Sequence, residues 1–337
     1  MTAFLQYLAL NVFITIPVLA EADKPATDSV QAQIQTAVSR GLTVAQKAAA
    51  SYPKHRNCFS CHHQTLPMLA MVTARSGGIE IDRELLQAQA EFTHQSFAER
   101  KDAMKEGKGI GGTSMTVGYG LWALDLAGGK PDDTTEAMVT FLLKSQHDDG
   151  RWARFTSRPP LEDSNVTCTV LAAYGMQKYA SEAQRADVEA AIARAKLWLA
   201  GAAIESQEDR AAKLWGLHLL GGEPDKLESA RDAVLAAQRE DGGWSQLEGM
   251  ASDAYATGQS LFVLRESGLA TSDPAYERGV RFLLRSQCED GSWLVETRSK
   301  PIQTFFDNGD PHGKHQFISI PATSWAVAAL AGADRPR

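Results

Sequence analysis

A short motif occurs three times, each time after an apolar, helix-like stretch, and it constrains the fold more than any other feature of the sequence. The three copies are SQHDDGRW (145–152), AQREDGGW (237–244) and SQCEDGSW (286–293). Each has Gln, then Asp-Gly, then Trp. The first spacing between the tryptophans is about twice the second, and a fixed spacing of this size indicates stacked supersecondary units. A degenerate copy without Gly and Trp is expected near Gln207.

Two kinds of helix alternate along the chain. Amphipathic stretches such as 82–100 and 181–199 are expected to face water on one side. Between them lie runs that are apolar on most faces, which predicts burial; these runs are 65–78, 116–129, 169–176, 210–222, 257–268 and 323–333. Strand signals are nearly absent. Six outer and six inner helices predict an all-α fold, an (α/α)6 toroid. The alternative, an open solenoid, would leave the apolar inner helices on a solvated concave face.

The three turns resemble the QW repeats of squalene–hopene and oxidosqualene cyclases. The expected toroid is also similar to protein prenyltransferase β subunits, and the similarity in architecture spans residues ~30–332. The resemblance implies that the Gln and Trp side chains tie each outer helix to the turn that follows; these are Gln146, Trp152, Gln238, Trp244, Gln287 and Trp293. It also implies an apolar or isoprenoid-like ligand in a central cavity, with candidate lining residues Tyr119, Trp122, Tyr174, Trp215, Tyr255 and Trp325.

The acid motif of squalene–hopene cyclases, D-x-D-D-T, is not intact in this chain. At the expected place, the start of an inner helix, the sequence is DSNVT (163–167), with Val166 where the family has its central acid. Cyclisation started by protonation is therefore not expected. Whether the chain is an enzyme stays open, with haem-dependent oxidoreductase and terpenoid-related activities as the candidates.

The N-terminus predicts export. Residues 1–20 contain no charged side chain, have an apolar core from Phe4 to Val18, and end in a small-residue cleavage site at Ala20. This pattern is typical of a secretory signal peptide, followed by a single toroid domain over 21–337. The protein is then periplasmic or secreted, with no membrane span after cleavage. An uncleaved N-terminal anchor is the alternative.

The segment CFSCHH contains a C-x-x-C-H motif, Cys58, Cys61 and His62. This is the attachment signature of c-type haem, in which two thiols bind the haem vinyl groups and the adjacent His binds iron. Attachment of this kind takes place outside the cytoplasm, in agreement with the signal peptide. The sequence therefore predicts one covalent haem c in the first outer-to-inner loop. A disulfide or half of a zinc site are the alternatives, but Cys168 and Cys288 do not form a second pair.

Histidines of the last long loop are candidates for a second metal ligand. His312 and His315 lie in FFDNGDPHGKHQF, and all long outer-to-inner loops are expected at one end of the toroid. Either His is a candidate sixth ligand of the haem iron or a ligand of a separate metal. The alternative is a solvated loop.

Two carboxylates, Asp163 and Asp253, recur shortly before inner helices and are candidate catalytic groups. A pair of carboxylates facing one cavity would suit a carbohydrate-active α/α-barrel enzyme. Helix capping is the alternative role.

Charge narrows the choice of partners. The formal net charge is −7, and Lys and Arg do not cluster, so a nucleic-acid partner is not expected.

The leading hypothesis is an exported toroid with one covalent haem c, an apolar small-molecule ligand and a redox partner protein. A non-catalytic haem c electron-transfer or binding module is the second hypothesis.

Overall fold

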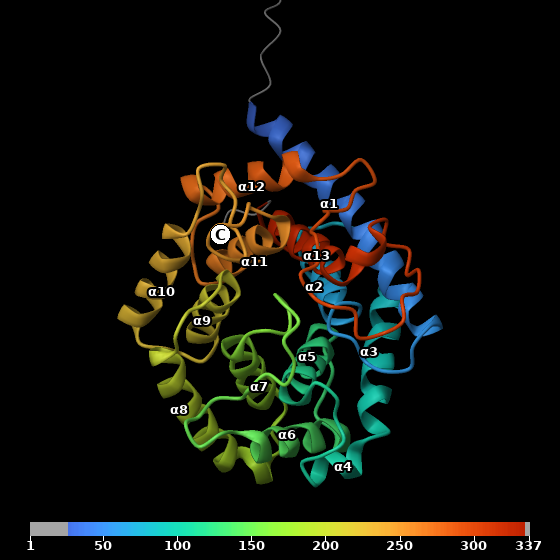
Figure 1. The fold of residues 1–337 in the computed structure, drawn as a ribbon, viewed down its shortest axis with the longest axis vertical. Helices are drawn as coiled ribbons and strands as arrows, with labels where there is room; N and C mark the ends of the chain where they lie inside the picture. Colours follow the sequence, from blue (N-terminus) through green and yellow to red (C-terminus); the bar gives the residue numbers. More distant parts are fainter. Residues whose placement is uncertain (1–25, 334–337) are drawn as a thin grey trace, which may run out of the picture.

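Outer and inner helices alternate along the chain and form two concentric rings, as the computed structural model shows (Figure 1). It describes residues 26–333; the predicted signal peptide lies outside the described residues. The outer ring consists of α1 (Ala26–Ser51), α3 (Arg83–Ala98), α6 (Asp133–Ser145), α8 (Arg185–Gly201), α10 (Pro224–Ala236) and α12 (Pro274–Ser286). The inner ring consists of α2 (Thr65–Ser76), α5 (Thr113–Leu126), α7 (Asn165–Tyr179), α9 (Gln207–Leu219), α11 (Ala254–Glu266) and α13 (Gln316–Ala333). A short helix, α4 (Lys101–Lys105), follows α3.

The rings are closed. Each inner helix contacts the next, and the last, α13, contacts both α11 and the first inner helix, α2. In the outer ring α12 contacts α1, and the two lie next to each other in Figure 1. These contacts between the two ends of the chain confirm the predicted (α/α)6 toroid and exclude the open solenoid.

The three Gln–Trp turns make the same hydrogen bonds. In the second, Trp244 Nε1 donates to the Val234 carbonyl at 2.7 Å, and Gln238 Nε2 donates to Gly242 O in its own turn and to Ala275 O of the next outer helix. Equivalent bonds join the first turn to Ala191 and the third to Ala37. Each Gln therefore links its turn to the next outer helix, and Gln287 in this way closes the outer ring onto α1.

Close packing of the inner helices follows from their composition. Gly258 on α11 faces α13 so closely that an added Cβ would lie 2.7 Å from the backbone of Trp325 and Ala326. Among the described residues, the segment Gly313–Ala333 is long and apolar enough to cross a membrane, but 94% of its apolar 18-residue window is buried inside the structure. Its apolarity is therefore explained by its place in the core.

The turn expected near Gln207 differs from the sequence prediction. The outer helix ends earlier, at Gly201, and Gln207 begins α9 with Ser206 as its N-cap. The Ser206 hydroxyl accepts a hydrogen bond from the Asp209 backbone N–H, and the Asp209 carboxylate accepts one from the Ser206 backbone N–H. This reciprocal capping stabilises the start of α9. A short capped connection therefore stands where a degenerate Gln–Trp turn was expected.

Candidate functional site

A cavity of about 470 Å³ opens where the outer-to-inner loops meet. Its walls come from three segments far apart in sequence: 52–63 after α1, the α6–α7 loop at Arg158 and Glu162, and the α12–α13 loop together with the start of α13. We call it the mouth cavity. Its size lies within the usual range of small-molecule sites, about 300–1,000 Å³. The expected convergence of the long loops is thus seen in the structure.

The C-x-x-C-H motif adjoins this cavity. Cys61 and His62 line it, whereas Cys58 is half-buried, with its Sγ 3.6 Å from the Tyr52 hydroxyl, and Tyr52 itself lines the cavity. Burial, aided by the charges of His63 and Arg158, lowers the pKa of His62 well below its usual range. The ring is therefore neutral at physiological pH, which is the form in which imidazole binds metals.

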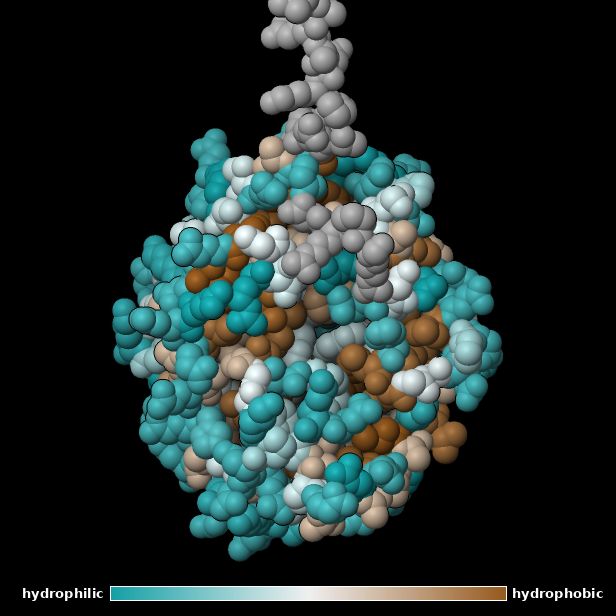
Figure 2. All heavy atoms as spheres, turned by 180° about the vertical axis from the view of Figure 1, so that it is seen from behind, coloured by the Kyte–Doolittle hydropathy of each residue, from teal (hydrophilic) through white to brown (hydrophobic). Residues whose placement is uncertain are grey.

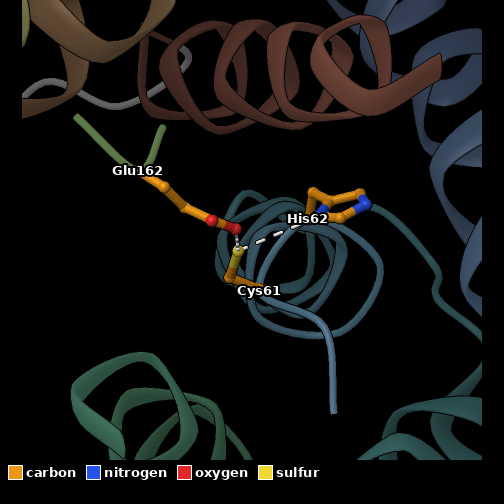
Figure 3. Close-up of side chains that lie close together, drawn as sticks. All are labelled: Cys61, His62 and Glu162. Atoms are coloured by element: carbon orange, nitrogen blue, oxygen red, sulfur yellow. Dashed lines mark hydrogen bonds between the residues drawn. The ribbon is translucent and has the colours of Figure 1, made fainter. Parts of the chain in front are cut away.

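A carboxylate and a guanidinium, those of Glu162 and Arg158, complete the cavity wall beside Cys61. The Cys61 thiol donates to Glu162 Oε1 at 3.6 Å, and Glu162 accepts from Arg158 Nη1 at 3.1 Å. The Arg158 guanidinium also lies 4.0 Å from the centre of the Phe317 ring. In Figure 3 the Glu162 carboxylate points toward Cys61, and the His62 ring points away from Glu162. Burial and the Glu162 charge raise the pKa of the Cys61 thiol.

The next histidine, His63, is a structural neighbour of the motif. It is buried, stacks near Tyr52 at 4.4 Å between ring centres, and shares a hydrogen bond with the Asn308 side chain of the last loop. Burial lowers the pKa of His63 to about 3. This contact fastens the last loop to the motif.

The two histidines of the α12–α13 loop, His312 and His315, differ in whether they line the mouth cavity. His315 lines the mouth cavity, and its Nδ1 accepts a hydrogen bond from the Thr297 backbone at 3.0 Å. His312 does not line the cavity; its Nε2 lies 2.6 Å from the Ser292 hydroxyl in the third Gln–Trp turn. Only His315 therefore shares a cavity with Cys61 and His62.

The axis of the toroid is closed by aromatic side chains. The Trp122 ring lies 4.8 Å from the Trp215 ring and 6.1 Å from the Trp325 ring, and the space left among them is about 10 Å³. The aromatic residues predicted to line an open central cavity instead pack against one another, because bulky rings from the alternate inner helices α5, α9 and α13 meet on the axis. In the described part of the chain, the space large enough for a ligand at the loop end is the mouth cavity.

A buried glutamate lies beside this aromatic cluster. Glu208 on α9 accepts hydrogen bonds from the Thr167 hydroxyl at 2.8 Å and the Tyr255 hydroxyl at 2.9 Å. Burial raises the pKa of Glu208 to about 7, against the opposing effect of these hydrogen bonds. Its neighbour Asp209 accepts from the Ser164 hydroxyl at 2.6 Å and thereby links α9 to the start of α7.

Glu208 is expected to make stability fall with rising pH. The folded protein keeps this proton up to about pH 7, while the unfolded chain releases it near pH 4.5. Between these values the folded state binds more protons, so the unfolding free energy decreases as pH rises, by roughly 3 kcal/mol at most. Urea denaturation from pH 4.5 to pH 8 should show a shallower decrease for Glu208→Gln than for the wild type.

A matched control for this prediction is Glu228→Gln, on the exposed face of α10. It should leave the pH profile of stability unchanged. Equal pH slopes for wild type and Glu208→Gln would show that Glu208 is ionised throughout this range.

Asp163 and Asp253 have structural partners and do not line the mouth cavity. Asp253 is the N-cap of α11 and accepts from the Ala256 backbone at 2.9 Å. Burial raises the pKa of Asp253 to about 6. Asp163 pairs with Arg154 at 3.2 Å and accepts from Ser157, while Ser164 is the N-cap of α7. Capping thus accounts for Asp253, and an ion pair for Asp163.

Sequence reasoning missed Glu162, Arg158 and Glu208. Glu162 and Arg158 lie in a loop without a recognisable motif, and a single Glu at the start of a helix is common on protein surfaces. The available signal for Glu208 was its register: Ala212 and Trp215 follow it by four and seven residues, so Glu208 lies on the buried face of α9.

Comparison with known proteins supports the fold. No family model and no curated protein matches the sequence. Among solved structures, a variant of the type II terpene cyclase MstE from Scytonema with the product merosterolic acid A has a TM-score of 0.62 at 14% identity, over 91% of this chain and 99% of that chain. The chain has a terpene cyclase-like α/α toroid fold.

Two further structures match over similar lengths. MstE with the substrate geranylgeranyl dihydroxybenzoate has a TM-score of 0.59 at 14% identity, over 91% of this chain and 99% of that chain. A glycosidase has a TM-score of 0.53 at 11% identity, over 88% of this chain and 98% of that chain. At such identities the toroid is shared by proteins of different activity, so function has to be argued from the site.

Proposed function

We propose that this protein is an exported haem c protein on a terpene cyclase-like toroid, and that it holds an apolar, isoprenoid-like molecule at the mouth cavity beside the haem. The observation that carries the proposal is that Cys61 and His62 of the C-x-x-C-H motif line the same cavity as His315, which lies near the other end of the chain. Cys58 and Cys61 would bind the haem covalently, and His62 would ligate its iron. A bound c-type haem supplies electron transfer at this place.

The cavity lining suits this group. Phe59, Phe306 and Phe317 offer apolar surface for a porphyrin ring. Arg158, Lys300 and Lys314 also line the cavity, and such cations pair well with carboxylates like the haem propionates. Cys58 does not line the cavity, and its Sγ lies 3.6 Å from the Tyr52 hydroxyl, so attachment requires the thiol to turn from this hydroxyl toward the cavity.

An apolar ligand is proposed at the rim of the same cavity. Ile302 and Phe305 line it and yet are 60% and 58% exposed. Exposed apolar side chains at the edge of a cavity are typical of ligand or partner sites. The closed axis favours a binding or electron-transfer role over cyclisation of a chain inside the toroid.

Ligand binding is tested with farnesol as an apolar probe. Replacing Ile302 with Asp should weaken binding about tenfold or more, because a charge replaces an apolar contact worth roughly 1.5–3 kcal/mol. Isothermal titration calorimetry measures the affinity. The control is Leu197→Asp, an exposed apolar residue on the outer helix α8, which should bind as the wild type does. Equal affinities for all three proteins would place the ligand elsewhere.

His315 is proposed as the sixth iron ligand. Because its Nδ1 accepts from Thr297, the neutral ring carries its proton on Nε2; binding iron through Nε2 would move that proton and cost one hydrogen bond, about 1 kcal/mol. His315→Ala should change the iron from low spin to high spin and allow carbon monoxide binding. His147→Ala, which removes an exposed histidine of the first Gln–Trp turn outside the cavity, should not. An unchanged spectrum in His315→Ala would remove the loop as a ligand donor.

A further inference from the structure

The third Gln–Trp turn differs from the other two in one position. The residue after Gln is His147 in the first turn, Arg239 in the second and Cys288 in the third. The third turn is also contacted by the end of the α12–α13 loop, because His312 of this loop is hydrogen-bonded to Ser292 in the turn. A thiol and an imidazole therefore meet at the turn that closes the outer ring.

Three potential metal ligands are gathered there. Cys288 Sγ, a carboxylate oxygen of Asp290 and a ring nitrogen of His312 all lie within 4.8 Å of one another. Cys288 and His312 are half-buried and Asp290 is exposed. The Ser292 hydroxyl lies between the last two, hydrogen-bonded to both. Donors around a tetrahedral zinc ion are about 3.3–3.8 Å apart, so closure onto an ion requires movements on the order of 1 Å.

A second observation points to a cation at this place. Asp310 is 5% exposed, and its Oδ1 accepts from the His312 backbone at 2.9 Å. Its Oδ2 is buried and has no hydrogen-bond partner. A buried acceptor without a partner costs about 1–3 kcal/mol.

We propose that Cys288, Asp290 and His312 form a metal site for a Zn²⁺-like ion, with the Asp310 carboxylate beside it. One thiolate, one imidazole and carboxylate oxygens are a ligand set that zinc accepts. The ion would neutralise the carboxylates of Asp290 and Asp310. It would also replace the hydrogen-bonded bridge that the Ser292 hydroxyl makes between Asp290 and His312. It would fasten the end of the α12–α13 loop, at His312, to the third Gln–Trp turn, which follows α12 and is hydrogen-bonded to α1 through Gln287. The segment that carries His315 would thereby be held in place. The site is separate from the mouth cavity and does not depend on haem.

The test uses the full-length chain with zinc alone as the probe. All variants carry Cys58→Ser and Cys61→Ser, so that the other donor cluster, Cys61, His62 and Glu162, cannot bind zinc through sulfur. After removal of metals with a chelator, addition of zinc and dialysis, elemental analysis should find one zinc per chain. Zinc-edge X-ray absorption should show one sulfur neighbour at about 2.3 Å.

Variants identify the ligands. Cys288→Ser and His312→Gln should each weaken zinc binding at least about tenfold, whereas Cys168→Ser should have no effect because Cys168 is buried within α7. Absence of retained zinc, or a bound zinc without a sulfur neighbour, would overturn the proposal. The absorption measurement needs no variant of the site itself, so it decides the matter even where Cys288→Ser does not fold.

Discussion

Replacing Trp244 with alanine is expected to lower the free energy of unfolding by about 3–5 kcal/mol, the usual cost of truncating a buried aromatic side chain. Trp244 has no exposed surface, and its Nε1 donates to the Val234 carbonyl near the end of α10. Its backbone N–H donates to the Thr257 hydroxyl at the start of α11. The truncation would therefore leave a cavity and remove the indole hydrogen bond where an outer helix, a turn and an inner helix join.

Urea denaturation followed by far-UV circular dichroism measures this loss. The control is Trp198→Ala, because Trp198 is half-buried on the outer helix α8 and makes no indole hydrogen bond of the kind seen in the turns. It should cost clearly less. A loss below about 1 kcal/mol for Trp244→Ala, the size typical of an average substitution, would contradict the role of these turns as packed joints.

Replacing both Cys58 and Cys61 with alanine is expected to abolish covalent haem attachment completely, because both thioether bonds start from these thiols. Haem staining of a denaturing gel and the intact mass of protein from a host with a haem-attachment system measure the result. The fold should survive, since Cys58 is only half-buried and Cys61 packs at the cavity wall.

The matched control is Cys168→Ala, in which a fully buried thiol of the inner helix α7 is lost. It should retain covalent haem. Haem that stays attached to the double variant would show that another group holds it. Loss of haem from Cys168→Ala would mean that the fold, rather than the motif, controls attachment.

The architecture could be predicted because it depends on patterns that repeat along the chain. Apolar runs alternating with amphipathic ones define inner and outer helices, and six pairs of similar length close into a ring. The resemblance to QW repeats implied that Gln146, Gln238 and Gln287 tie helices to turns, and in the structure all three link their turn to the next outer helix. The connection at Gln207 was mistaken because a capped helix start also contains Ser, Gln and Asp.

The site could be predicted only in part, because no local sequence pattern determines how side chains from distant helices and loops pack against one another. Convergence of the long loops indicated that His312 or His315 lies near the motif; His315 lines the same cavity as Cys61, whereas His312 contacts Ser292, and no sequence pattern distinguishes the two. The closed axis depends on the rotamers of Trp122 and Trp215, which composition does not fix. On the face seen from behind, hydrophobic residues lie among hydrophilic ones (Figure 2), so surface apolarity alone does not single out a ligand site on that face.

The most direct test of the central claim is the absorption spectrum of the protein produced for export in a host with a working haem c attachment system. The protein should be coloured, should give a pyridine haemochrome spectrum of the c type, and should keep its haem through denaturation and acid–acetone extraction, because thioether bonds survive both. Colourless protein from that host, or haem that is fully extracted, would contradict the assignment of Cys58, Cys61 and His62 as a haem c site.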